Sequence, residues 1–140
     1  MSMKLLMAAV ALVGGLALAG EREAETCIRT RIWDGYAEGW AVRTATKAAL
    51  REGEYRVYAL TLYAGMAYRF LGCADKGAVD VDLVLHDADG VELARDETDD
   101  GEPTLAFTPE ATGTYYVAVY AARLAEGSSQ AGVSMAATYR

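Results

Sequence analysis

Acidic side chains gathered between Asp80 and Glu102 are the part of this sequence that points most directly to chemistry. Asp80 and Asp82 stand two apart in an alternating segment, so their carboxylates would share one face of a strand, about 7 Å apart. Calcium prefers six to eight oxygen ligands, many of them carboxylates. Asp96 and Asp99 follow in an acidic loop. The spacing predicts a calcium site formed by Asp80, Asp82, Asp96 and Asp99, and the alternative is an acidic surface that is only solvated.

Catalytic chemistry has little support in this sequence. His86 is the only histidine and would have to serve as the base for any serine or cysteine nucleophile. No phosphate-binding loop is present, because Gly113 and Thr114 open a strand and not a helix. We therefore expect a protein that is not an enzyme, with no catalytic or cofactor-binding residues.

The two cysteines, Cys27 and Cys73, are candidates for a disulfide. An even number of cysteines in an oxidising compartment favours pairing, and a bridge across this loop would stabilise the fold by about 4 kcal/mol. Two unpaired thiols are the alternative. A zinc site is not expected, because the chain has one histidine and no closely spaced cysteine pair.

Residues 1–19 have the composition of a signal peptide. Lys4 precedes an uncharged apolar stretch from Leu5 to Leu18, and Ala17 and Ala19 are small residues at the positions that a signal peptidase reads. The apolar stretch is shorter than the ~20 residues of a spanning helix. We expect a periplasmic or secreted protein with no integral membrane segment after cleavage, and an uncleaved anchor is the alternative.

The charge balance excludes one class of partner. Cleavage after residue 19 would leave 121 of the 140 residues and, by removing one lysine and no acid, shift the formal charge from −7 to −8. Such a surface repels phosphate backbones, so we expect no nucleic-acid binding. The remaining length suits one domain with its own core.

The segment from Asp34 to Arg51 has a helical pattern, because Trp40 and several alanines recur at roughly helical spacing. Gly53 would end this helix. We expect Trp33, Tyr36 and Trp40 to pack against the domain, with an exposed binding platform as the alternative. The sequence thus divides into a signal peptide (1–19), an N-terminal segment with a short helix (20–53) and a β-sandwich domain (54–140).

Beyond Gly53 the apolar residues alternate, which is the pattern of half-buried strands. The clearest row is Val79, Val81, Leu83 and Leu85, and Ala88-Asp89-Gly90 is typical of a tight hairpin turn. About seven short strands at regular spacing predict a mainly β, antiparallel, jelly-roll-like sandwich. The other alternating segments lie at residues 58–62, 66–70, 91–93, 105–107, 115–119 and 133–139.

Residues 62–120 resemble the bacterial pre-peptidase C-terminal domain family. The resemblance rests on four stretches: Leu62 and Gly65 before Tyr68 and Phe70; Asp80-Val81-Asp82-Leu83-Val84-Leu85; Asp87, Asp89-Gly90 and Asp96; and Pro103 to Pro109 with Gly113-Thr114-Tyr115-Tyr116-Val117. It implies a jelly-roll-like β-sandwich that acts as an exported, non-catalytic module. No peptidase domain precedes these residues, and His86 stands where such sequences often have Tyr, so roles tied to an attached protease do not carry over.

Two functions are compatible with these observations. The first is a protein-interaction module, accessory to an exported or envelope protein. The alternative is a carbohydrate-binding module, supported by calcium, that stacks sugars on some of the nine Tyr and two Trp. Exposed rings on one face would favour a glycan as partner. A flat apolar patch or an unpaired sheet edge would favour another exported protein.

Overall fold

The computed structural model describes residues 20–96, 98 and 100–140, and within them it contains one helix and eight strands. The helix covers residues 20–36. The predicted signal peptide (1–19) lies outside the described residues. The strands are β1 (Ala41–Leu50), β2 (Tyr55–Leu62), β3 (Tyr68–Ala74), β4 (Ala78–His86), β5 (Glu92–Asp96), β6 (Thr104–Phe107), β7 (Gly113–Leu124) and β8 (Ala131–Tyr139).

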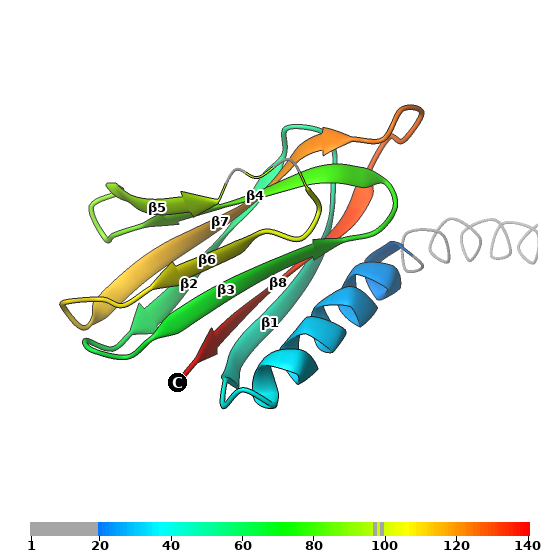
Figure 1. The fold of residues 1–140 in the computed structure, drawn as a ribbon. Helices are drawn as coiled ribbons and strands as arrows, with labels where there is room; N and C mark the ends of the chain where they lie inside the picture. Colours follow the sequence, from blue (N-terminus) through cyan, green and yellow to red (C-terminus); the bar gives the residue numbers. More distant parts are fainter. Residues whose placement is uncertain (1–19, 97, 99) are drawn as a thin grey trace, which may run out of the picture.

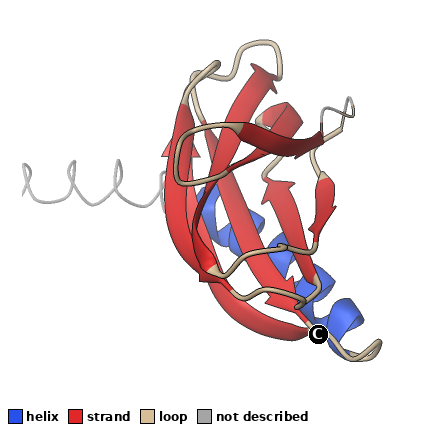
Figure 2. Cartoon of the chain, turned by 90° about the vertical axis from the view of Figure 1, so that its left-hand side faces the viewer, coloured by secondary structure: helices blue, strands red, loops and turns tan. Residues whose placement is uncertain are grey.

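The strands form two four-stranded antiparallel sheets that pack as a sandwich (Figure 1). The first sheet has the order β1-β8-β3-β6 and the second the order β2-β7-β4-β5. Coloured by secondary structure, the described residues are mostly strand, with the single helix beside them (Figure 2). The predicted mainly-β sandwich preceded by one helix is therefore confirmed.

The core lies between the two sheets and follows the alternation of the strands. Leu83 and Leu85 of β4 point inward and are fully buried, as are Val117 of β7 and Met135 of β8. Phe70 of β3 completes this cluster from the first sheet. These side chains drive the two sheets together, because burying each one contributes roughly 1.5–3 kcal/mol.

The helix predicted from Asp34 to Arg51 is wrong for most of its length, because residues 41–50 form β1. Alanines lie on both faces of this strand: Ala48 packs toward the core, whereas Ala45 and Ala49 pair with Ala136 and Gly132 of β8 on the side of the helix. A strand with small apolar residues on both faces lacks the alternation of apolar and polar residues by which a strand is recognised in a sequence. Alanine also has a high intrinsic preference for the helix. Since β1 pairs along its whole length with β8, the sandwich includes residues before 54.

The observed helix lies earlier and ends where the predicted one began. Ala24 and Ile28 are one turn apart and both buried. Gly39 has a φ of 91°, and the amide of Trp40 donates to the carbonyl of Gly35, which closes the helix end. Glycine with positive φ is a frequent helix terminator. Gly35 and Gly39 therefore form the C-terminal end of this helix.

The turns of the second sheet follow the sequence more closely. Gly90 has a φ of 82° and the Asp87 carboxylate accepts hydrogen bonds from the amides of Asp89 and Val91, which forms the predicted β4–β5 hairpin. One position of the predicted inward row is wrong. Val79 is 39% exposed, because the register of β4 against β7 shifts between Ala78 and Asp80.

The helix covers the outward side of the first sheet (Figure 1). Ile28 packs with Leu71 and Ala136, and the Ser134 hydroxyl donates a 2.7 Å hydrogen bond to the carbonyl of Ala24. Lys47 of β1 forms a 2.7 Å ion pair with Glu25. No helix in the described part of the chain has the length and apolar character needed to span a bilayer.

Candidate functional site

The outward side of the second sheet has no helix over it in the described chain, and we call it the open face (Figure 1). Its side chains form rows across the strands, because residues opposite each other in an antiparallel pair share a face. In one row Tyr55 of β2 stands opposite Tyr120 of β7, which stands opposite Asp82 of β4. The next two rows are Val57, Ala118, Val84 and Arg95, then Ala59, Tyr116, His86 and Glu92.

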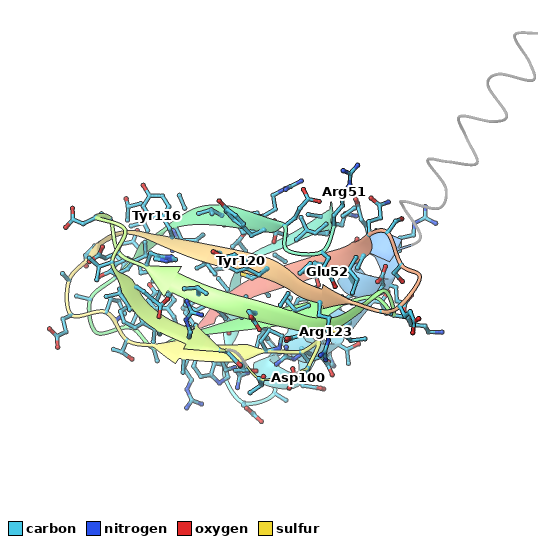
Figure 3. The ribbon with its side chains drawn as sticks, turned by 90° about the horizontal axis from the view of Figure 1, so that it is seen from above. Arg51, Glu52, Asp100, Tyr116, Tyr120 and Arg123 are labelled. Atoms are coloured by element: carbon cyan, nitrogen blue, oxygen red, sulfur yellow. A yellow bond between two sulfur atoms is a disulfide. The ribbon has the colours of Figure 1, made fainter. Side chains whose placement is uncertain are left out.

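Tyrosine rings dominate one half of this face. Figure 3 shows Tyr116 and Tyr120 along β7, on the side of the sheet that faces the viewer. The rings of Tyr55 and Tyr120 are in contact, with centroids 4.9 Å apart, and Tyr55 is 52% exposed. Between the two rows, Ala118 and Val84 point outward yet are only 1% and 3% exposed. Neighbouring side chains therefore lie across them, and the face is partly apolar.

An acid pair, Asp80 and Asp82, lies at the edge of this aromatic surface. The Oδ1 atoms of both side chains are buried and have no hydrogen-bond partner. Burial raises the pKa of Asp82 to about 6, with further contributions from the charge of Asp80 and a hydrogen bond between the two carboxyl groups, while the charge of Arg95 opposes them. Two carboxyl groups in such contact share a proton readily. The pair is thus a site of concentrated, incompletely compensated negative charge.

Two arginines lie near the acid pair, and the charge of one of them, Arg95, acts on Asp82. Arg95 donates hydrogen bonds to both carboxylate oxygens of Glu92, at 3.0 and 2.5 Å. Arg123 stands opposite Asp80 in the register and is exposed. Within the described residues His86 has no hydrogen bond to a hydroxyl or a thiol. Its partner on β7 is Tyr116.

Three of the four residues of the predicted calcium site, Asp80, Asp82 and Asp96, lie within the described chain, and the charge of Asp96 acts on Asp82. Asp80 and Asp82 adjoin each other, but the carboxylate of Asp96 accepts hydrogen bonds from Thr98 and from the amide of Thr104. Burial raises the pKa of Asp96, but these hydrogen bonds from Thr98 and Thr104 outweigh it and leave the pKa below its usual value. Asp99 lies outside the described residues. The calcium site stays a prediction.

Cys27 and Cys73 form a disulfide, with 5.9 Å between their Cα atoms. The bridge joins the helix to β3, in the middle of the first sheet. The Glu102 carboxylate lies against it, 3.4 Å from the Cys27 sulfur. These three residues are the one group in the described chain with three potential metal ligands close together. Bridged sulfurs are not thiolates, so the group is a structural link and not a metal centre.

The aromatic residues around the helix end divide into two sets. Trp40 is buried, and the guanidinium groups of Arg69 and Arg140 lie 4.5 and 4.6 Å from its ring centroid. Trp33 and Tyr36 are instead 73% and 65% exposed and stack on each other at 5.9 Å. The expectation that all of them pack against the domain is therefore wrong for Trp33 and Tyr36. Both rings belong to the outer side of the helix end.

A pocket of about 180 Å³ opens beside the same helix end. One of its two arginines, Arg31, donates hydrogen bonds to the carbonyls of Gly72 and Pro103 and to the Thr104 hydroxyl. Arg31 therefore fastens the helix to β3 and to the segment that leads into β6. The lining residues are Arg31, Asp34, Gly35, Glu38, Arg69, Leu71 and Thr104.

No protein-family model matches the sequence, and no curated protein matches it. Fold and disulfide together define the class instead: a β-sandwich stabilised by a bridge to an outer helix.

Comparison with solved structures shows a likeness of fold. The chain is similar in fold to the pre-peptidase C-terminal domain of collagenase from Bacillus anthracis, with 18% identity, a TM-score of 0.51, and coverage of 67% of this chain and 87% of that one. Similarity also extends to PliG of Aeromonas hydrophila, a periplasmic inhibitor of g-type lysozyme, with 17% identity, a TM-score of 0.49, and coverage of 69% and 85%. The predicted likeness to the pre-peptidase C-terminal fold is confirmed, and at these identities the likeness is one of fold alone.

Proposed function

We propose that this protein is an exported, non-catalytic module that binds another protein through the open face. One observation carries the proposal: a disulfide-bridged helix covers the first sheet, whereas the second sheet presents Tyr55, Val57 and Tyr120 outward. Exposed aromatic and aliphatic side chains on a flat sheet are typical of interaction surfaces. Strand β2 is also the edge of its sheet, so its outer backbone groups can pair with a partner.

Two features support export and the absence of catalysis. A disulfide forms and persists in oxidising compartments such as the periplasm or the exterior. Hydrolytic chemistry with His86 would require a neighbouring nucleophile, and Cys73 is committed to the bridge with Cys27. A periplasmic or secreted interaction module accounts for both.

Site-specific photo-crosslinking in the native envelope tests this proposal. A photoreactive residue at position 57 replaces Val57, which is 50% exposed on the open face, and a matched residue at position 29 replaces exposed Arg29 on the helix. We expect a discrete protein adduct from position 57 and none from position 29. Equal adducts from both positions, or adducts from position 29 alone, would contradict docking through the open face.

Carbohydrate binding is the second candidate, and the exposed stack of Trp33 and Tyr36 favours it. Sugars pack against such rings through their apolar faces. Affinity electrophoresis through gels that contain soluble polysaccharides measures this binding as retardation. Trp33→Ala should abolish the retardation, and Tyr63→Ala, which removes a comparably exposed ring elsewhere, should leave it unchanged. If no polysaccharide retards the native protein, this candidate is eliminated.

A further inference from the structure

The open face combines an acid pair with an aromatic surface. Asp80 and Asp82 are partly exposed side chains whose carboxyl groups are in contact, and the one buried oxygen of each accepts no hydrogen bond, so an outside ligand would meet their exposed oxygens. Directly across the strand pair from Asp82, the ring of Tyr120 lies beside that of Tyr55. The aromatic surface is apolar and the acid pair is anionic, so a matching ligand has a cationic head next to a flat or apolar body.

We propose that the open face recognises an arginine side chain of a partner protein, with its guanidinium against Asp80 and Asp82 and its plane on the ring of Tyr120. This inference rests on the proposed protein-binding function and specifies the partner's chemistry. Binding of this arginine requires no rearrangement of the chain, because Asp80, Asp82 and Tyr120 already stand in adjacent rows of one sheet face.

Arginine fits this arrangement better than lysine does. A guanidinium is planar, offers five donors in a fixed fork, and stacks on aromatic faces. It can donate to two carboxyl groups at once while resting on a tyrosine ring. The formal charge of −7 for the whole chain attracts such a basic partner over longer distances.

Protonation of the acid pair makes the binding of arginine depend on pH. The groups near the pair are Tyr120 and Arg123 of β7, which stand opposite Asp82 and Asp80, and Arg95 and Asp96 of β5, whose charges act on Asp82. Asp100 also lies beside the pair, because its carbonyl accepts a hydrogen bond from the amide of Val81. Because burial and the adjacent Asp80 raise the pKa of Asp82 to about 6, Asp82 is mostly protonated at pH 5 and mostly ionised at pH 7.5. A cation from outside binds best when both charges are present. Affinity should therefore fall as the pH is lowered from 7.5 to 5.

Titration of the isotope-labelled full-length mature protein with a doubly blocked arginine measures this interaction by NMR. The matched control ligand is doubly blocked citrulline, which has the same shape and no charge. We expect saturable shifts of backbone amides around Asp82 and Tyr120 with arginine and none with citrulline. Asp82→Asn should weaken binding about 5-fold, in line with the ~1 kcal/mol of a partly exposed ion pair. Glu110→Gln, a neutralised acid in an exposed loop, should bind like the native protein.

Several results would overturn the inference. These are equal shifts with citrulline, equal affinity in Asp82→Asn, or an affinity that does not change between pH 5 and 7.5. Shifts of the same amides on simple dilution would identify a second copy of the chain as the occupant, and shifts with xylose or glucose oligosaccharides alone would identify a sugar. A crosslink from position 57 without arginine binding would leave the docking face intact and reject only arginine. Absence of that crosslink would reject the docking face itself.

Discussion

The contact between Asp80 and Asp82 predicts that this protein becomes more stable as the pH falls through the mildly acidic range. A carboxyl group whose pKa is raised on folding binds its proton more tightly in the folded chain than in the unfolded one. Burial first, and the charge of Asp80 second, raise the pKa of Asp82 from 3.8 to about 6. The folded state is therefore penalised above pH 6, and the penalty disappears as the pH falls from 6 toward 3.8.

The size of this penalty follows from the same values. A change from 3.8 to about 6 corresponds to roughly 3 kcal/mol when it is fully expressed. Asp82 is partly exposed, and solvent screening reduces the effect to about 1–2 kcal/mol. Asp82→Asn removes the charge at nearly constant size. We expect this substitution to raise the free energy of unfolding by about 1–2 kcal/mol at pH 7.5 and to leave it almost unchanged at pH 4.

Urea unfolding at both pH values provides the measurement, with Asp80→Asn and the double substitution completing a cycle. Because either substitution removes the repulsion between the two carboxylates, the double variant should gain little beyond one single variant. Glu110→Gln serves as the control for general charge reduction. The reasoning is refuted if Asp82→Asn destabilises the protein at pH 7.5, if its effect is the same at both pH values, or if the two single effects add.

Three further predictions concern the framework and the metal. Replacing Cys27 and Cys73 with serine should lower the free energy of unfolding by about 4 kcal/mol, a value that follows from their sequence separation of 46 residues. The same change should increase hydrogen exchange throughout the helix. Unchanged stability would contradict a stabilising role for the disulfide. Gly72→Ala should cost about 1–3 kcal/mol in urea unfolding, because its Cβ would lie 2.7 Å from the ring of Pro103, whereas Gly113→Ala meets no atom and should cost less. Calcium added to chelator-treated protein should release heat in calorimetry if the predicted site exists, and Asp80→Asn should abolish that heat; no heat at millimolar calcium would eliminate the site.

The sequence predicted the sandwich because its apolar residues alternate where each strand has one face in the core. Leu83 and Leu85 show this pattern, and the turn at Gly90 marks the hairpin that follows them. The prediction failed at β1, whose alanines face the core on one side and the helix on the other. It also failed at Val79, because a register shift in a single strand pair reverses the side to which a residue points, and local patterns contain no signal for it.

The acid pair of the candidate site could be predicted from the sequence, whereas the aromatic residue beside it could not. The spacing of Asp80 and Asp82 placed both side chains on one face, as the structure has them, since strand period two depends on local geometry alone. Their row partner Tyr120 comes from a strand about 40 residues later, and its position opposite Asp82 depends on the pairing of β7 with β4. Sequence alternation indicates that Tyr120 points away from the core, but not which side chain stands beside it.

If arginine binds at the acid pair, the stability of the folded chain and the affinity for arginine both depend on the charges of Asp80 and Asp82. At neutral pH the burial of the charged Asp82, and then its repulsion by Asp80, lower the stability of the folded chain, and an external guanidinium would relieve the repulsion. A ligand that binds only the folded state raises the free energy of unfolding by an amount set by its concentration and affinity. Blocked arginine should therefore raise the melting temperature more at pH 7.5 than at pH 5, and more than blocked citrulline does. In Asp82→Asn, which is already relieved, the difference between the two ligands should shrink. If arginine stabilises that variant as much as the native protein, the guanidinium binds elsewhere and the acid pair is not its site.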